Sequence, residues 1–513
     1  MQPLKLLLPT VYDPREWSQP YSAASMFLGA SVHADPPLRE RFDIRLISFD
    51  SASDPAAVAE ALAAHDPDIL GVGLYAWNEA VLRRALPIVK RLRPGLRILM
   101  GGQTVLYSDA AFHRDFPDVE LFFRGDSEEV FAEVLRRLMN GGYDRLVSGA
   151  DVLDGLSGHA NFAARAQSRA SSDLRRIASY YLPDSSGRGF FDLTAAEHWE
   201  SLWWETSRGC VYTCAFCGFD AQELGFRHHP VERVLAEFEL FIARGVRRIM
   251  VTDAILGGKM ANAKAVLRGL SQPERAHDIY LYGFVRPEMI DEELASLLKS
   301  ARFGFVNVGL QTVNPAVPRE MRSNKLEAIR RGLPWLAVYG VPFQLDLIAG
   351  FPGDTFEGFC GSLRFVIEDA RPSRFRVYRL GVLAGTPLDR MVRTHGAEWL
   401  SCDEEGLATG SYSWVLDDLL RMLRLANLAV ALYAYLRRKD WLGREEELRN
   451  LDYFLDLFEW AEANSDVAGD LTDWDQKSAS LDEAPELDAV IETLLERVQP
   501  PVRRVARTAN ARA

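Results

Sequence analysis

The chain has 513 residues, of which 48% are hydrophobic and 26% are charged. A single core stops growing at about 250–300 residues, so this length predicts two or three domains. A formal net charge of -13 argues against a broad nucleic-acid-binding surface. The sequence has neither a signal-peptide pattern nor a membrane-spanning apolar run, so we expect a cytoplasmic protein without nucleic-acid or membrane partners.

Residues 1–149 alternate between β-like runs and helical patterns. The five runs are PLKLLLPT, FDIRLISF, DILGVGLY, LRILMGGQ and ELFFRGDSEE. This alternation predicts an α/β domain with a doubly wound, Rossmann-like sheet. Such sheets bind ligands at the carboxyl ends of their strands. The residues expected to gather at that edge are Thr10, Tyr75, Ala76, Trp77, Asn78, Gly101, Gly102, Gln103, Arg124 and Gly125.

Residues 150–199 are rich in Gly, Ala and Ser and are predicted to be a linker. Residues 200–385 again alternate strands with amphipathic helices. The predicted strands are 202–207, 247–252, 279–284, 305–310, 343–348 and 375–380. Strands joined by crossover helices pair in parallel, so we expect a partial (β/α)6, TIM-like barrel with its active site at the carboxyl ends of the strands.

Three of the five cysteines lie in SRGCVYTCAFCGF, at Cys210, Cys214 and Cys217. A structural zinc ion takes four protein ligands, and neither a second cysteine pair nor a nearby histidine at ligand spacing is present. His228 and His229 lie in a polar RHHP turn that we expect to be solvated. The lone residues Cys360 and Cys402 are expected in the core. Three thiolates favour a [4Fe–4S] cluster with one open iron.

The spacing C-x-x-x-C-x-x-C, with Phe216 before its last cysteine and TSRGC around its first, resembles the signature of the radical S-adenosylmethionine (SAM) superfamily. The segments GLQT (309–312) and DLIAGFPGDT (346–355) resemble later motifs of the same family. The resemblance implies that the cluster binds SAM. The SAM contacts that it implies are Phe216, Asp253, Arg286 and Gln311. Helix capping by Asp253 and a salt bridge of Arg286 are the structural alternatives.

The segments GVGLYAWN, MGGQT and RGDSEE resemble the cobalamin-binding domain fused to one large class of these enzymes, although RGDSEE departs from the usual G-E-G-E. The edge residues named above would then be cobalamin contacts. No D-x-H-x-x-G motif supplies a histidine ligand, so Trp77 is the candidate beneath the cobalt. Packing of Trp77 under a helix, and a flavodoxin-like domain that binds flavin or nothing, remain alternatives.

Residues 386–500 are predicted to form a helical domain that caps the substrate site, followed by a disordered tail at 501–513. The apolar run LANLAVALYAYL spans only 12 residues and predicts a buried helix.

The resemblance implies a cobalamin-dependent radical SAM methyltransferase. It would methylate an unactivated carbon of a natural product or peptide through a 5'-deoxyadenosyl radical and methylcobalamin, with a flavodoxin- or ferredoxin-type electron donor. The alternatives are a non-methylating cyclase or ring-rearranging enzyme, polar methyl transfer from methylcobalamin, and a sensor that binds both cofactors without catalysis.

Overall fold

The computed structural model describes residues 2–12, 20–184, 187–219, 224–441, 449–464 and 488–497. The chain divides into two compact units. The first comprises Met1–Thr213, Gly218–Leu281 and Leu383–Thr386, and the second comprises Cys214–Cys217, Tyr282–Val382 and Pro387–Ala513. The boundary falls within one strand, β11 (Tyr280–Val285), so each unit is described by itself.

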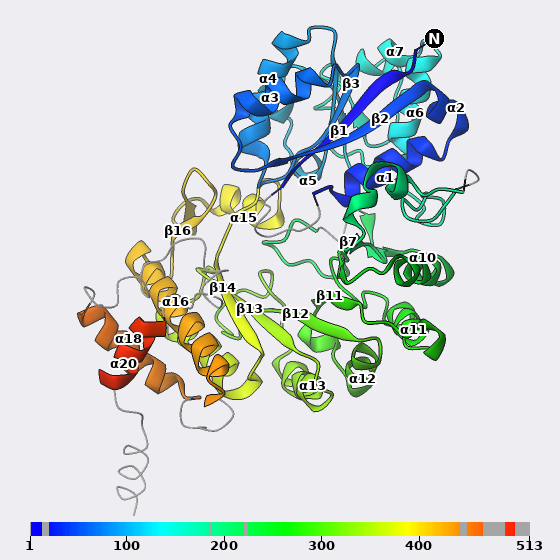
Figure 1. The fold of residues 1–513 in the computed structure, drawn as a ribbon. Helices are drawn as coiled ribbons and strands as arrows, with labels where there is room; N and C mark the ends of the chain where they lie inside the picture. Colours follow the sequence, from blue (N-terminus) through cyan, green and yellow to red (C-terminus); the bar gives the residue numbers. More distant parts are fainter. Residues whose placement is uncertain are drawn as a thin grey trace, which may run out of the picture. The chain divides into compact units, whose positions relative to one another are not determined.

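The first unit contains a sheet of order β2-β1-β3-β4-β5-β6 (Figure 1). Its first five strands pair in parallel, which confirms the predicted doubly wound fold. The segment predicted as a linker adds the sixth strand, which pairs antiparallel with β5. The strands are β1 (Leu4–Tyr12), β2 (Phe42–Asp50), β3 (Ile69–Gly73), β4 (Arg97–Gly101), β5 (Val119–Phe123) and β6 (Leu156–Ser157).

Both faces of this sheet are buried because alternate side chains of each strand point to opposite sides. Leu7 of β1 belongs to one hydrophobic cluster with α3 and α4, whereas Leu6 and Leu8 belong to another with α2, α6 and α7. Figure 1 shows these two helical layers on either side of the strands. The helices are α1 (Ala23–His33), α2 (Pro36–Arg41), α3 (Pro55–Ala64), α4 (Glu79–Leu92), α5 (Gln103–Tyr107), α6 (Glu128–Met139) and α7 (Tyr143–Val147).

Local sequence signals fix where several of these helices begin. Asp35 and Asp54 accept hydrogen bonds from backbone N–H groups in the first turns of α2 and α3, and a proline follows each aspartate. An aspartate cap satisfies one of the free N–H groups at a helix start, and proline tolerates the first position because it lacks an N–H.

The second sheet has the order β14-β13-β12-β11-β10-β7, the sequential order expected of a partial (β/α)6 barrel. The pairs β7–β10, β12–β13 and β13–β14 are parallel. The strands other than β11 are β7 (Ser201–Trp204), β10 (Arg248–Val251), β12 (Phe303–Gln311), β13 (Phe343–Ala349) and β14 (Arg374–Arg379). The connecting helices are α10 (Val231–Arg244), α11 (Met260–Leu270), α12 (Glu292–Ser300), α13 (Leu326–Val338) and α14 (Phe356–Arg364). The first barrel strand ends earlier than predicted, at Trp204.

The carboxyl-terminal part of the second unit is mainly helical. The long helix α16 (Leu416–Arg438) is apolar enough to cross a membrane by composition, but 83% of its most apolar window is buried inside the protein. This confirms the predicted core helix. Further elements are α15 (Pro387–His395), β15 (Leu400–Cys402), β16 (Ala408–Ser411), α18 (Leu451–Ala463) and α20 (Asp488–Arg497). The predicted tail at 501–513 lies outside the described residues.

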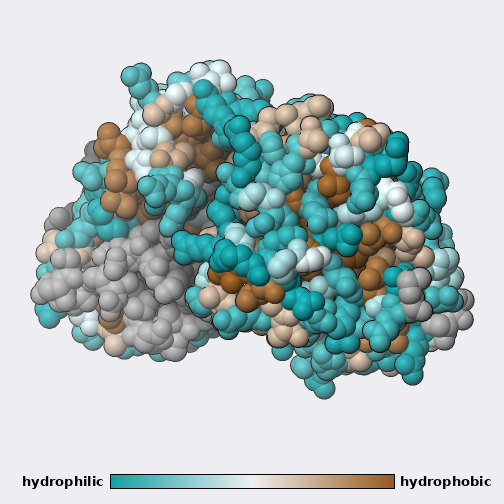
Figure 2. Space-filling model, turned by 90° about the horizontal axis from the view of Figure 1, so that it is seen from above, coloured by the Kyte–Doolittle hydropathy of each residue, from teal (hydrophilic) through white to brown (hydrophobic). Residues whose placement is uncertain are grey.

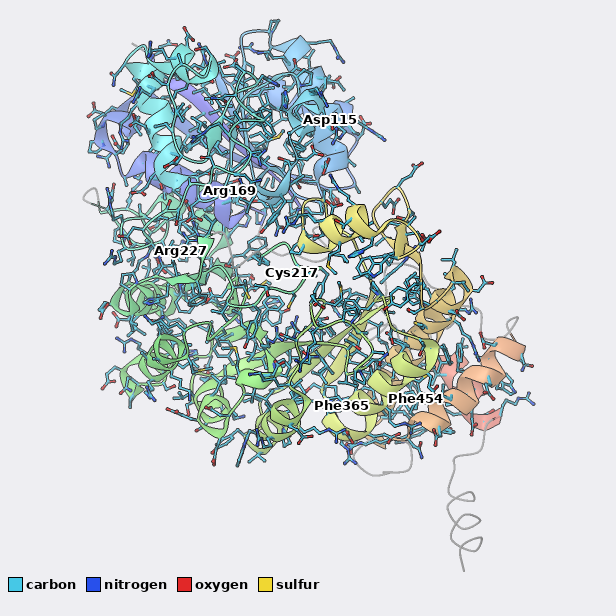
Figure 3. All side chains as sticks on the ribbon, turned by 180° about the vertical axis from the view of Figure 1, so that it is seen from behind. Asp115, Arg169, Cys217, Arg227, Phe365 and Phe454 are labelled. Carbon is cyan, nitrogen blue, oxygen red and sulfur yellow. The ribbon has the colours of Figure 1, made fainter. Side chains whose placement is uncertain are left out.

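A hydrogen bond joins two parts of this helical region that are distant in sequence. The N–H of Leu451, at the start of α18, donates to Glu368 Oε1 at 2.9 Å, in the helix Phe365–Ala370 that continues α14. Figure 3 labels Phe365 and Phe454 on these two elements. The face drawn in Figure 2 is mostly hydrophilic, with separate hydrophobic areas between the polar residues.

Helix α4 provides a direct test of the first core. Leu86 is 2% exposed and packs in the cluster beneath α3 and α4, whereas Leu92 on the same helix is 49% exposed. We expect Leu86→Ala to lower the free energy of unfolding by about 2–5 kcal/mol, because the cavity adds to the lost burial. Leu92→Ala should change it by less than about 0.5 kcal/mol. Denaturant unfolding of both variants checks this, and equal effects would contradict the assigned core.

Candidate functional site

The three clustered cysteines lie on the loop that follows β8 (Ser207–Arg208), just beyond the end of the first barrel strand. All three side chains are half-buried, and no disulfide joins any of the five cysteines. Cys210 belongs to the first unit, where its Sγ accepts a hydrogen bond from the Tyr212 N–H at 3.4 Å. Cys214 and Cys217, the latter labelled in Figure 3, belong to the second unit. The loop therefore carries three cysteines, none of them in a disulfide, next to strand ends.

Among the residues that the structure describes, no three His, Cys, Asp or Glu side chains are grouped closely enough to hold one metal ion. This does not conflict with a cluster, because each cysteine of a [4Fe–4S] cluster binds a different iron and the sulfurs stand further apart than the ligands of a single ion.

Two arginines lie against the Cys214 sulfur. Arg286 Nη1 is 3.5 Å and Arg322 Nη1 is 3.4 Å from Cys214 Sγ. Arg286 also forms an ion pair with Glu288 at 2.9 Å, so the predicted salt bridge and the contact with the sulfur are both present. Burial lowers the pKa of Arg322, while the neighbouring sulfur opposes that shift. Two guanidinium groups at this distance stabilise a thiolate, the form of cysteine that binds metals.

Aromatic and turn residues surround the same segment in the second unit. The rings of Phe216 and Phe351 are 5.6 Å apart. Phe351 belongs to the predicted DLIAGFPGDT turn, in which Gly350 and Gly353 have φ of 96° and 84°. These left-handed conformations are accessible to glycine at little cost, which accounts for the Gly-Phe-Pro-Gly sequence.

Gln311 ends β12 in a strained conformation. Its φ is 69°, a value that non-glycine residues seldom adopt, and the register with β13 shifts between Gly309 and Gln311. The Asn324 side chain donates to the Leu310 and Thr312 carbonyls at 2.8 and 2.6 Å and holds this strand end in place. Strain of this kind persists only where surrounding contacts enforce it, and it concentrates at functional sites.

Asp253 is buried at the end of β10 and accepts four hydrogen bonds. The donors are the backbone N–H groups of Thr206 and Ser207, at 2.7 and 2.9 Å, and their two hydroxyls, at 2.6 and 2.5 Å. Burial raises the pKa of Asp253 to about 6, against the opposite effect of these bonds. The carboxylate therefore anchors the segment that leads into the cysteine loop. Among the described helices it caps none.

A buried ion cluster lies beside that anchor, in the first unit, and sequence reasoning missed it. Arg208 contacts Asp126 at 3.2 Å, Glu128 at 2.8 Å and Glu205 at 3.0 Å. His229, expected in a solvated turn, is instead fully buried, with Nε2 3.0 Å from Glu205 Oε1. Cys360 is buried, as predicted for a core residue, whereas Cys402, also predicted in the core, is half-buried on β15.

The predicted edge residues of the first sheet divide into two groups. Tyr75 and Trp77 stack with ring centroids 4.6 Å apart and nearly parallel planes, and Trp77 is 59% exposed. Ala76 between them is also exposed. Trp77 therefore does not pack under a helix. These aromatic residues form an accessible platform at the carboxyl end of β3.

The other polar edge residues form hydrogen bonds within the protein. The Asn78 amide bonds to the Tyr75 N–H and the Gly73 carbonyl, at 2.8 and 3.0 Å, and closes the turn after β3. Thr10 Oγ1 accepts from the Ser22 N–H at 3.0 Å. Arg124 is 1% exposed and donates to the carbonyls of Ser108 and Ala166. These three side chains stabilise the loops at this edge of the sheet through hydrogen bonds within the protein.

The glycines at this edge allow close backbone contacts. Gly102 and Gly125 have φ of 100° and 92°, and a side chain at either position would collide with the backbone, of Leu74 and of Ala170 respectively. Gly101 has no such collision and faces Phe123. Gln103 at the start of α5 lies against Gly218, directly after the last cysteine, and both residues belong to the first unit.

Comparisons with known proteins agree with this arrangement. Residues 204–366 match the model of the Radical SAM superfamily. The chain is 24% identical over 335 residues to the cobalamin-dependent radical SAM methyltransferase TokK of Streptomyces tokunonensis, which covers 63% of this chain and 48% of TokK. The chain thus spans about half the length of the curated relatives that it matches first.

Two solved structures share the fold. The cobalamin-dependent SAM radical enzyme OxsB, with aqua-cobalamin and SAM bound, matches with a TM-score of 0.66 at 14% identity, over 98% of this chain and 81% of OxsB. The radical SAM methyltransferase TsrM of Kitasatospora setae, with tryptophan and a SAM analogue bound, matches with a TM-score of 0.59 at 18% identity, over 77% of this chain and 78% of TsrM. Residues 204–366 therefore resemble a radical SAM domain, within a chain that shares the fold of OxsB and TsrM.

Proposed function

We propose that this protein is a cobalamin-dependent radical SAM methyltransferase acting on a carbon of a small natural product or peptide. The observation that carries the proposal is the three-cysteine loop of a radical SAM domain in a chain that also has a doubly wound sheet with an aromatic platform at its carboxyl edge. When bound, the cluster and SAM supply an adenosyl radical, and cobalamin supplies a methyl group.

The chain's own residues fit the cluster and SAM. Cys210, Cys214 and Cys217 are half-buried and form no disulfide, and they would bind three irons. Arg286 and Arg322 compensate the negative charge of the Cys214 sulfur. Phe216 and Gln311 are proposed to contact SAM. Asp253, with its acceptor capacity filled by Thr206 and Ser207, orients the loop.

The first unit fits cobalamin at the edge of its sheet. Trp77, stacked on Tyr75, carries no metal-binding atom and would present an apolar face to the cofactor. Gly101, Gly102 and Gly125 are proposed to lie along the cofactor, and the last two also allow the close backbone contacts with Leu74 and Ala170 that shape this edge. Glu128, 5% exposed, has one carboxylate oxygen, Oε2, that accepts no hydrogen bond among the described residues. That oxygen can accept from an amide N–H of the corrin side chains.

The proposal extends to partners and location. A strong external electron donor of the flavodoxin or ferredoxin type would reduce the cluster, and a cytoplasmic location supplies such donors. The substrate is a small molecule, as in the tryptophan complex of TsrM, or a peptide.

The first test is SAM cleavage by the protein reconstituted with iron, sulfide and hydroxocobalamin under strong reductant. We expect 5'-deoxyadenosine from the wild-type protein and none from the triple variant with Cys210, Cys214 and Cys217 changed to Ala. Cys402→Ala, a cysteine away from the loop, should keep the wild-type yield. Absence of 5'-deoxyadenosine from the wild-type protein, also with candidate substrates, would contradict the radical route. It would favour polar methyl transfer if a methylated product still forms, and a sensor if none does. Formation of S-adenosylhomocysteine and a methylated product separates methyl transfer from cyclisation.

The second prediction concerns the Asp253 anchor. Asp253→Asn replaces one acceptor oxygen by an NH2 group that faces donors, so we expect about 1–3 kcal/mol less stability and lower iron content after reconstitution. Asp291→Asn is the matched control, because asparagine caps α12 as well as the native aspartate does. Iron analysis and thermal unfolding measure both effects. Normal iron content in Asp253→Asn would show that the anchor does not support the loop.

The third prediction concerns the aromatic platform. Trp77→Ala removes an exposed ring that the corrin would cover, so we expect roughly 10- to 150-fold weaker hydroxocobalamin binding, as burial of a large apolar side chain contributes about 1.5–3 kcal/mol. The melting temperature should not change, since Trp77 lies outside the core. Absorption titration measures the affinity, with the similarly exposed Tyr412→Ala as control. An unchanged affinity would rule out the platform as the cobalamin contact.

A further inference from the structure

Arg208 is the residue through which the cysteine loop meets the first sheet. It stands two positions before Cys210, and its guanidinium forms ion pairs with Asp126 and Glu128, at the carboxyl edge of that sheet. Its Nε and Nη2 also bond to Glu205 at 3.1 and 3.0 Å. All of these residues belong to the first unit. The cluster therefore connects two segments that lie about 80 positions apart in the sequence.

The surroundings of Arg208 favour a fixed geometry. The guanidinium lies 5.2 Å from the centre of the Phe27 ring, and the three carboxylates around it are largely buried. Burial would raise the pKa of Glu205, but Arg208 and His229 outweigh it and lower the pKa to about 2. A planar guanidinium surrounded by three carboxylates has few alternative arrangements.

A second arginine closes the cluster on the other side. Arg227 of β9 (Arg227–His228), labelled in Figure 3, pairs with Asp126 and bonds to Ser171 Oγ at 3.1 Å. The Ser172 N–H donates to the same Asp126 carboxylate at 2.9 Å. Asp126 thus holds both strands of the β8–β9 pair against the segment after β5.

Glu128 of this cluster and the proposed cobalamin platform follow β5 and β3, so both lie at the carboxyl edge of the first sheet. Burial raises the pKa of Tyr75, the charge of Arg208 opposes that rise and the charge of Glu128 adds to it. Tyr75 therefore lies in the field of both groups. The unbonded Oε2 of Glu128 lies in the first turn of α6. A ligand that covered Tyr75 and Trp77 and donated to this oxygen would fix the carboxylate that holds Arg208.

We infer that Arg208 is a positioning residue that couples the two cofactor sites, so that cobalamin at the first sheet and an assembled cluster on the cysteine loop strengthen each other's binding. This inference rests on the proposed function. The cysteine motif does not imply this role for Arg208, because its TSRGC segment accounts only for Cys210 as a ligand of the cluster. Coupling through a contiguous set of contacts must be reciprocal and is typically 5- to 150-fold.

The test compares hydroxocobalamin dissociation constants, measured by absorption, for protein with and without the reconstituted cluster. We expect the constant of the wild-type protein to be at least about fivefold lower with the cluster. Arg208→Met should bring this ratio close to one. Arg208→Lys should give an intermediate ratio, because lysine keeps the charge but not the planar fork. The exposed Arg175→Met, which loses only its pair with Asp173, should keep the wild-type ratio.

Hydrogen exchange of the cofactor-free protein provides a readout that does not depend on cofactors. Arg208→Lys and Glu128→Gln, both mild changes, should speed exchange in residues 124–130 and in residues 205–210 together, whereas Arg175→Met should affect neither. Faster exchange in only one segment would overturn the inference. So would a folded Arg208→Met protein with the wild-type ratio, or a wild-type ratio of one. A wild-type protein that binds no cobalamin refutes the proposed function instead, and the exchange result still decides whether Arg208 joins the two segments.

Discussion

The cysteine loop depends on two buried charges that hold the residues leading into it. Asp253 accepts every hydrogen bond that Thr206 and Ser207 can direct to it, and Arg208, the next residue, is held by three carboxylates. A buried charge is costly unless it is paired and hydrogen-bonded, so these side chains leave the segment little freedom. The loop beyond them can then be irregular, as a loop that binds a cluster must be, without losing its starting point.

Parallel pairing decides which residues are able to act together. In both sheets the chain returns through helices, so the loops that follow consecutive strands emerge at the same edge. This places Trp77 and Glu128 at one edge of the first sheet, and Gln311 and the Gly350–Gly353 turn at one edge of the second. Function on such folds resides in these loops, and the strands beneath them serve as a rigid support.

The features that sequence predicted correctly are local in the chain. Strand and helix order follows from apolar periodicity, and the cysteine spacing and the Gly-Phe-Pro-Gly turn lie within a few residues. The features that it missed depend on distant partners. The sequence around His229 does not indicate that its side chain is buried and contacts Glu205. The segment RGDSEE differs from the family pattern, but this difference does not indicate that Asp126 and Glu128 bind Arg208. The hydrogen bonds of two predicted contacts were not foreseen either: the Asn78 amide bonds within its own turn, to Tyr75 and Gly73, and Arg124 donates to the distant carbonyls of Ser108 and Ala166.

The central claim is that one chain holds two cofactors through two separate sets of residues. Iron, sulfide and cobalamin contents of the anaerobically reconstituted protein, compared with those of the triple cysteine variant, test it most directly. The account predicts about four irons per chain in the wild-type protein, the number in a [4Fe–4S] cluster, and a loss of that iron in the variant. It also predicts one cobalamin in both proteins. Iron without cobalamin, or iron that survives removal of the three thiols, would contradict it.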